Sequence, residues 1–381
     1  MHYKKPQYYD NFTCIADRCP DTCCAGWQIV IDEESLEKYD NVKGSFGERL
    51  KSSIDWREGT FRQNNRRCSF LNEQNLCDLY TQLGAESLCK TCTMYPRHVE
   101  EFADLREYSL SLSCPIAAKI ILECKEPVKF AEYEDDAPDE LEEEFEDFDY
   151  LMFTQLEDGR EVIFHILQNR QMGMKKRMSL VLEMAEEMQN CVDEERLFDV
   201  DEVIETYSEK MEEAEDLSEV SMAGSGYLSR CKEFSLLLRL ERLREEWSQL
   251  LESAWEVLYE KGEKEYLILK EEFDKEVGYQ SKQKEEWSCL AEQLMIFFVY
   301  TYFCGAVYDD RIYSKMALSV FCTEWIEELV MARWILQGKK ITKEDYIQVS
   351  YRLAREIEHS DVNLDLLEEW FEKERESLKY P

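Results

Sequence analysis

Residues 14–27 read CIADRCPDTCCAGW, and this stretch contains four cysteines. A second stretch, residues 68–97, reads CSFLNEQNLCDLYTQLGAESLCKTCTMYPR and contains four more, and a ninth follows in Ser113-Cys114-Pro115. Thiols crowded in this way are typical of disulfides, metal sites or redox centres rather than of core packing. The candidate metal ligands are Cys14, Cys19, Cys23, Cys24, Cys68, Cys77, Cys89, Cys92 and Cys114.

The first residues, MHYKKP, precede no apolar run, so the sequence predicts no secretory signal. We therefore expect a cytoplasmic protein, in which stable disulfides are rare, and this favours a metal. Thiolates bind both zinc and iron–sulfur clusters. Only Cys89-x2-Cys92 has the spacing of a standard zinc pair, so spacing leaves the two metals open. We expect the adjacent Cys23 and Cys24 to point in different directions, and Cys114, before a predicted helix, to favour the thiolate.

The charge balance restricts the class of partner. The chain has 83 acidic and 46 basic residues, a net charge of −37. Such a surface argues against binding nucleic acid or an anionic membrane. It suits a cationic partner, such as a protein presenting lysines, or it serves solubility alone. The longest apolar stretch, residues 290–308, contains Glu292 and Gln293, so we predict a buried helix there rather than a membrane span.

The sequence predicts a mostly α fold, with an irregular cysteine-rich N-terminal metal-binding domain followed by an all-helical domain. We place the cysteine-rich domain at residues 1–124, an acidic linker at 125–150 and the helical domain at 151–381. In the first domain we expect a short strand and two short helices, at 28–31, 46–56 and 78–83. Apolar periodicity in the last domain predicts five main helices, at 227–259, 290–308, 312–336, 342–358 and 364–378. The remaining cysteines of the helical part are expected to be core residues: Cys191, Cys231, Cys289, Cys304 and Cys322.

At the cysteine stretches the chain resembles the bacterial flagellin lysine N-methylase family. The resemblance rests on residues 14–27, 68–77, 88–97 and 112–115, with weaker similarity at 166–170 and 305–309. The first 115 residues are also similar to a broader family of zinc- or iron-chelating cysteine clusters.

The resemblance implies transfer of a methyl group from S-adenosylmethionine to lysine side chains of flagellin. It also implies a [4Fe–4S] cluster, which favours iron–sulfur over the alternative, zinc. The sequence contains no strand followed by Gly-x-Gly-x-Gly, the usual cradle of S-adenosylmethionine. Cys19-x3-Cys23 is only the first half of the usual radical-enzyme pattern, so polar and radical transfer both stay open.

A lysine amine, with its ordinary pKa near 10.4, must lose a proton before polar attack. Asp21, Tyr80 and Tyr95 lie beside the cysteines and could assist or be structural, so the catalytic residues stay open. His98 is the only histidine close to the thiols in sequence and could be a ligand or a loop residue. Two other functions remain: a non-enzymatic zinc-binding protein-interaction module, and a redox sensor or electron carrier.

Overall fold

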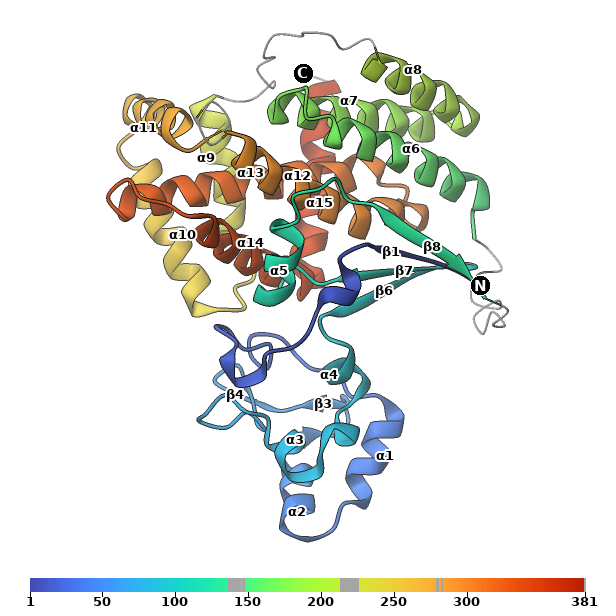
Figure 1. The fold of residues 1–381 in the computed structure, drawn as a ribbon, viewed down its shortest axis with the longest axis vertical. Helices are drawn as coiled ribbons and strands as arrows, with labels where there is room; N and C mark the ends of the chain where they lie inside the picture. Colours follow the sequence, from blue (N-terminus) through green and yellow to red (C-terminus); the bar gives the residue numbers. More distant parts are fainter. Residues whose placement is uncertain (136–144, 146–147, 213–225, 279–280, 282–283, 380–381) are drawn as a thin grey trace.

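The computed structural model has a small cysteine-rich lobe and a larger helical lobe, with a sheet beside the helices (Figure 1). It describes residues 1–135, 145, 148–212, 226–278, 281 and 284–379. Residues 13–95 form the small lobe, which we call the cysteine lobe. The prediction of a mostly α protein is confirmed, because the helices α5 to α15 make up most of the larger lobe.

The cysteine lobe is built from short elements. Its helices and strands are α1 (Glu33–Asn41), α2 (Gly44–Ser53), β2 (Ile54–Asp55), β3 (Thr60–Phe61), β4 (Gln63–Asn64), β5 (Arg67–Cys68), α3 (Asp78–Leu83) and α4 (Lys90–Met94). Helices α2 and α3 were expected, whereas the expected strand at 28–31 is only an isolated bridge from Val30 to Thr60. The Asp32 carboxylate caps α1 at Ser35 N (3.0 Å) and accepts a hydrogen bond from Lys90 N (2.7 Å), which ties α1 to α4.

A four-stranded sheet lies beside the helices, and the sequence patterns did not predict its full extent. Its strand order is β6 (Arg97–Phe102), β7 (Leu105–Leu110), β1 (His2–Pro6), β8 (Phe130–Glu134). Only β1 and β7 are parallel, and the other pairs are antiparallel. Strand β8 lies within the stretch expected to be an acidic linker, and residues 136–144 and 146–147 of that stretch lie outside the described residues. Arg160 fastens the sheet to α6 through a fully buried bidentate pair with Glu107 (Nη1–Oε2 2.7 Å).

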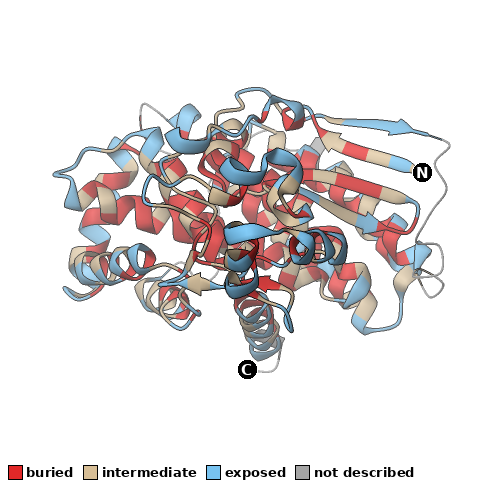
Figure 2. Cartoon of the chain, turned by 90° about the horizontal axis from the view of Figure 1, so that it is seen from below, coloured by how far each residue is buried: buried red, intermediate tan, exposed pale blue. Residues whose placement is uncertain are grey.

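The helical lobe is organised around α13. Its helices are α5 (Pro115–Leu122), α6 (Tyr150–Gln168), α7 (Met174–Asp193), α8 (Val200–Glu212), α9 (Tyr227–Leu237), α10 (Glu245–Leu258), α11 (Glu263–Glu276), α12 (Lys284–Tyr302), α13 (Ile312–Leu336), α14 (Lys343–Glu358) and α15 (Asp361–Lys379). Helix α13 packs against α7, α10, α12, α14 and α15, so it occupies the centre of this lobe. Figure 2 shows the buried residues concentrated where the helices face one another.

One long helix was predicted over residues 227–259, and this prediction is wrong. The structure has two helices there, α9 and α10, separated by residues 238–244. The reason is a buried carboxylate on α14: Glu356 accepts hydrogen bonds from the backbone N–H groups of Leu243 (2.6 Å) and Arg244 (3.2 Å). These bonds satisfy backbone donors that a continuous helix would have used internally, and they bring Arg244 to the cysteine lobe.

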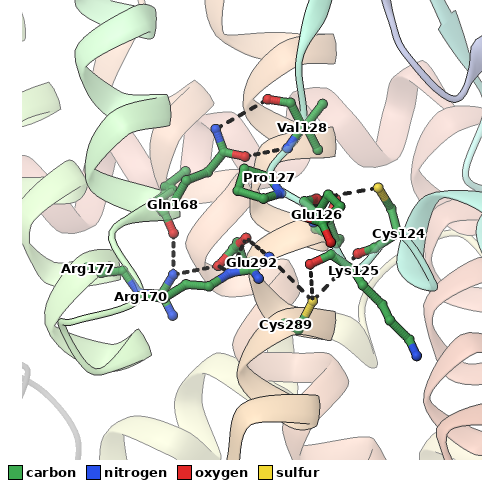
Figure 3. A network of polar contacts seen from close by, with 12 residues as sticks. Cys124, Lys125, Glu126, Pro127, Val128, Gln168, Arg170, Arg177, Cys289 and Glu292 are labelled. Carbon is green, nitrogen blue, oxygen red and sulfur yellow. Dashed lines mark hydrogen bonds and ion pairs between the residues drawn. The ribbon is translucent and has the colours of Figure 1, made fainter.

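The apolar stretch at 290–308 forms most of α12 and a following 3₁₀ turn. The segment Lys284–Tyr308 is long and apolar enough to cross a membrane, but 78% of its most apolar window is buried inside the protein. Its Glu292 is paired with Arg170 (2.8 Å) and Arg177 (2.9 Å), as Figure 3 shows. The weaker similarity at residues 166–170 therefore coincides with an ion-pair network that holds the corner between α6 and α7 against α12.

Candidate functional site

The cysteine lobe gathers five of the nine candidate thiols around its apolar core. Cys68 and Cys89 are buried in this core, and Cys24, Cys77 and Cys92 pack against it. All fifteen cysteines of the chain are free thiols. In the helical lobe Cys191, Cys304 and Cys322 are buried as expected, while Cys231 and Cys289 are half-buried.

Two thiol pairs stand in direct contact. The Cys89 and Cys92 thiols share a hydrogen bond, which lowers the pKa of Cys89 and raises the pKa of Cys92. The Cys23 thiol shares one with Cys24, and together with burial this raises the pKa of Cys23 well above its usual value. The expectation that Cys23 and Cys24 point in different directions is therefore wrong.

Of the remaining candidate thiols, Cys14, Cys19 and Cys23 lie in the cysteine lobe, and Cys114 lies at the start of α5 in the helical lobe. Cys14 and Cys23 lie close enough to Cys19 that negative charge on them raises the pKa of the Cys19 thiol. Cys19 and Cys23 act in the same way on Cys114. Burial raises the pKa of Cys114 to about 11, despite the N–H groups of the helix start that oppose this shift. The thiolate expected at Cys114 is therefore disfavoured in the folded chain without metal.

The thiols meet the requirements of a metal site in ligand type and number. Soft thiolate donors suit both zinc and iron–sulfur clusters. Among the residues that the structure describes, however, no three Cys, His, Asp or Glu side chains are already arranged around one metal position. The structure thus brings the candidate cysteine ligands together in pairs. Which cysteines bind the metal stays a prediction.

The lobe is docked on the C-terminal end of α14 by Arg355. Its guanidinium contacts the carboxylate of Asp21 (Nη1–Oδ2 2.5 Å) and donates to the Ser113 carbonyl (2.8 Å). Asp21 lies between Cys19 and Cys23, and its carbonyl accepts a hydrogen bond from the Cys19 thiol (3.0 Å). Arg355 is 5% exposed, so this contact lies in a low-dielectric environment where ion pairs are strong. Asp21, one of three candidate proton acceptors, therefore anchors the loop between Cys19 and Cys23, which we call the cysteine loop.

A stack of aromatic rings lies beside this ion pair. The Trp27 indole stacks on the His359 imidazole, with centroids 4.4 Å apart and planes 10° apart, and Tyr95 lies 5.7 Å from Trp27. Burial and the two nearby arginines lower the pKa of His359 to about 3, so its imidazole is neutral. Burial raises the pKa of Tyr95, so its phenol stays protonated and contacts Ser113 Oγ (3.0 Å). Tyr80 is 52% exposed on the lobe surface.

The carboxylate of Glu358 connects the same helix end to the strand–helix corner before Cys114. It accepts hydrogen bonds from Leu112 N (3.0 Å), Ser113 N (3.2 Å) and the Ser111 hydroxyl. These bonds fix the loop whose Ser113 hydroxyl also contacts His359 Nε2 (3.0 Å). Residues 14–27, 88–97 and 112–115 therefore all meet the end of α14.

Sequence reasoning missed the residues that α14 contributes to this site. The histidine that stacks on Trp27 of the first cysteine stretch is His359. His98, the candidate from the sequence, is half-exposed on β6 and contacts Glu100 (2.5 Å). The signal that could have found Arg355 and Glu358 was their position at the end of an amphipathic helix, where charges fall on an otherwise apolar face. Spacing alone did not connect this helix to cysteines more than 200 residues away.

The fold and the site define a mostly helical protein with a thiol-rich lobe docked on its C-terminal helices. The family model of the FliB lysine N-methylase C-terminal domain matches residues 160–381, which is more than half of the chain. The chain belongs to this family. The matched region includes α14, the helix that holds the cysteine lobe.

Relatives of the chain carry names that agree with this family. The flagellar biosynthetic protein FliU of Salmonella muenchen is 30% identical over 127 residues, which are 31% of this chain and 75% of that protein. Lysine-N-methylases of Salmonella choleraesuis and Salmonella typhimurium are likewise 30% identical over 127 residues, 31% of this chain and 32% of each relative. The matched part thus spans about a third of the length of these two enzymes. No solved structure matches the chain.

Proposed function

We propose that this chain is a protein lysine N-methyltransferase that moves a methyl group from S-adenosylmethionine to lysine side chains of flagellin. We further propose that it acts in the cytoplasm and that its cysteine lobe holds a [4Fe–4S] cluster. The observation that carries the proposal is the docking of the cysteine motifs on α14. Asp21, Trp27 and Ser113 contact Arg355 and His359 within the region that defines the family. The cysteine stretches and the family domain at residues 160–381 therefore contribute to one site.

The cluster would be held by thiolates from Cys19, Cys23, Cys24, Cys89 and Cys92, of which we propose that at least three are ligands. These five supply the tightest spacings and both contacting pairs. When bound, such a cluster supplies a redox-active iron centre.

The other residues of the site position it. Arg355 and Arg244 hold the loop between Cys19 and Cys23, Arg244 through a hydrogen bond to the Thr22 carbonyl (2.7 Å). The rings of Trp27, His359 and Tyr95 pack against one another beside this loop. The net charge of −37 gives the surface an attraction for cationic lysines, which raises the encounter rate.

The test is methyl transfer to flagellin by anaerobically purified protein supplied with radiolabelled S-adenosylmethionine. Label should enter native flagellin and should be absent from flagellin whose lysine amines have been chemically blocked beforehand. Equal labelling of both would exclude lysine as the acceptor, and no labelling of either by iron-loaded protein would exclude the proposed activity.

A second function is favoured by the small core of the cysteine lobe. The lobe has short elements and few apolar residues for its length, so a bound metal would contribute much of its folding energy. A non-enzymatic interaction module would use a bound zinc ion for the same purpose, to stabilise the fold of the lobe. Elemental analysis separates the two: iron with acid-labile sulfide supports the methylase, and stoichiometric zinc with no iron supports the module.

A further inference from the structure

A cavity of ≈ 150 Å³ lies where the cysteine loop meets the helical lobe. This space is well above the ~10–15 Å³ that a single water molecule needs, so it can hold the polar end of a ligand. The cavity is lined by Pro20 and Asp21 from the cysteine loop, by Arg244, Glu246 and Trp247 around the start of α10, and by Tyr351, Arg352, Arg355 and Glu356 from α14.

The lining contains hydrogen-bond donors without partners. The indole N–H of Trp247 is buried and has no acceptor, and the same is true of Nε of Arg244. Trp247 is 1% exposed. A buried donor without an acceptor costs about 1–3 kcal/mol, so such groups are normally satisfied by a ligand or water.

The position of Arg244 depends on a glycine of the cysteine motif. Gly26 has a φ of +96°, and a Cβ built on it would lie 2.6 Å from Nε of Arg244. Any side chain at position 26 would therefore displace the guanidinium. The motif sequence Ala25-Gly26-Trp27 thus keeps Arg244 against the cysteine loop, where it also contacts the Asp21 carboxylate (3.4 Å).

The charges of the lining suit a zwitterion. Three arginines and an indole N–H provide donors for a carboxylate, while Asp21, Glu246 and Glu356 provide acceptors for an ammonium group. Burial and the neighbouring Arg355 lower the pKa of Arg244, which indicates incompletely neutralised positive charge. An α-amino acid end carries both groups close together, whereas a simple anion would use only the arginines.

We propose that this cavity binds the α-amino acid end of the methyl donor, with its carboxylate on Arg244 and Trp247. This inference rests on the proposed function, because S-adenosylmethionine is the proposed donor. Its adenosine then lies outside the cavity. The position next to Asp21 places the amino acid end beside the loop that carries Cys19 and Cys23.

The test compares two probes by isothermal titration calorimetry on the full-length protein. S-Adenosylhomocysteine contains the amino acid end, and 5′-methylthioadenosine lacks it. Trp247→Phe removes the indole N–H and keeps an aromatic ring, and Arg244→Gln removes the charge. The matched control is Trp334→Phe, because Trp334 is also buried in the helical lobe with an unpartnered N–H but does not line the cavity.

Wild type and Trp334→Phe should bind S-adenosylhomocysteine more tightly than 5′-methylthioadenosine. Trp247→Phe and Arg244→Gln should each weaken binding of the first probe about tenfold and leave the second unchanged. The inference is overturned if both cavity variants keep the wild-type affinity for S-adenosylhomocysteine, or if the wild type does not distinguish the probes. Flagellin labelling by the wild type decides the proposed function separately, so a methylase with unaffected cavity variants would refute only the cavity assignment.

Discussion

Replacing Arg355 by methionine should separate the cysteine lobe from its support on α14. Methionine keeps most of the length and volume of the side chain and removes its charge. Among the residues that the structure describes, the change leaves the Asp21 carboxylate paired with Arg244 alone, at 3.4 Å, and it removes the Arg355 hydrogen bond to the Ser113 carbonyl. The loop between Cys19 and Cys23 then loses its main anchor.

The size of the effect follows from burial. Removing one partner of a buried ion pair costs about 3–5 kcal/mol. The Asp21 side chain is 23% exposed and keeps a second cation, which places the loss of this pair at the low end of that range. We expect the free energy of unfolding to fall by about 3 kcal/mol.

Urea unfolding followed by tryptophan fluorescence measures this loss, and iron analysis of the same samples measures metal retention. Arg375→Met is the matched control. Arg375 is 4% exposed and pairs with Asp193 (2.9 Å) and Asn190 (2.8 Å), so its loss should also destabilise the protein. It does not touch the cysteine lobe, so its metal content should stay at the wild-type level.

The reasoning is refuted if Arg355→Met unfolds within about 1 kcal/mol of the wild type, well below the cost of breaking a buried pair. It is also refuted if both arginine variants lose iron equally, because the loss would then reflect general destabilisation.

Four further predictions test other parts of the account. Phe297→Ala should cost roughly 3–5 kcal/mol, because Phe297 is 2% exposed, whereas Phe198→Ala at a 76% exposed site should cost under about 0.5 kcal/mol in the same denaturation assay. Cys89→Ser should lose metal and soluble yield, while Cys322→Ser in the helical core should keep its metal by elemental analysis; equal metal in both would contradict the ligand assignment. Burial raises the pKa of Glu356 from 4.5 to about 7, so the folded protein binds a proton that the unfolded chain releases. The stability of the wild type relative to Glu356→Gln should therefore be greatest below about pH 4.5 and fall by up to about 3 kcal/mol as pH rises to about 7, and parallel pH–stability curves would count against this. The rate of flagellin methylation at subsaturating substrate should fall as salt rises, through screening over about 8–10 Å, and a rate that rises with salt would mean that net repulsion dominates.

The sequence predicted the elements that depend on local patterns. Thr342 and Asp345 form a capping box at the start of α14, close to the predicted start, and Pro115 stands in the first turn of α5. Helix α13 matches its predicted bounds because its apolar pattern is long and uninterrupted. In each case the deciding interactions lie within a few residues along the chain.

The elements that depend on distant partners could not be predicted. Strand β8 is exposed at most positions and is a strand only because β1 pairs with it. The break between α9 and α10 depends on Glu356, which is more than 100 residues away. The sequence identified the cysteines, Asp21 and Tyr95 of the site. It did not identify Arg355 and His359 as their partners, because no local pattern connects α14 to cysteines more than 200 residues away.

The most direct test of the central claim is mass spectrometry of flagellin incubated with iron-loaded protein and S-adenosylmethionine bearing a deuterated methyl group. The account predicts deuterated methyl groups on lysine side-chain amines, and their loss when Cys89→Ser replaces the wild type. A wild-type protein with its full iron content that leaves every flagellin lysine unlabelled would contradict it.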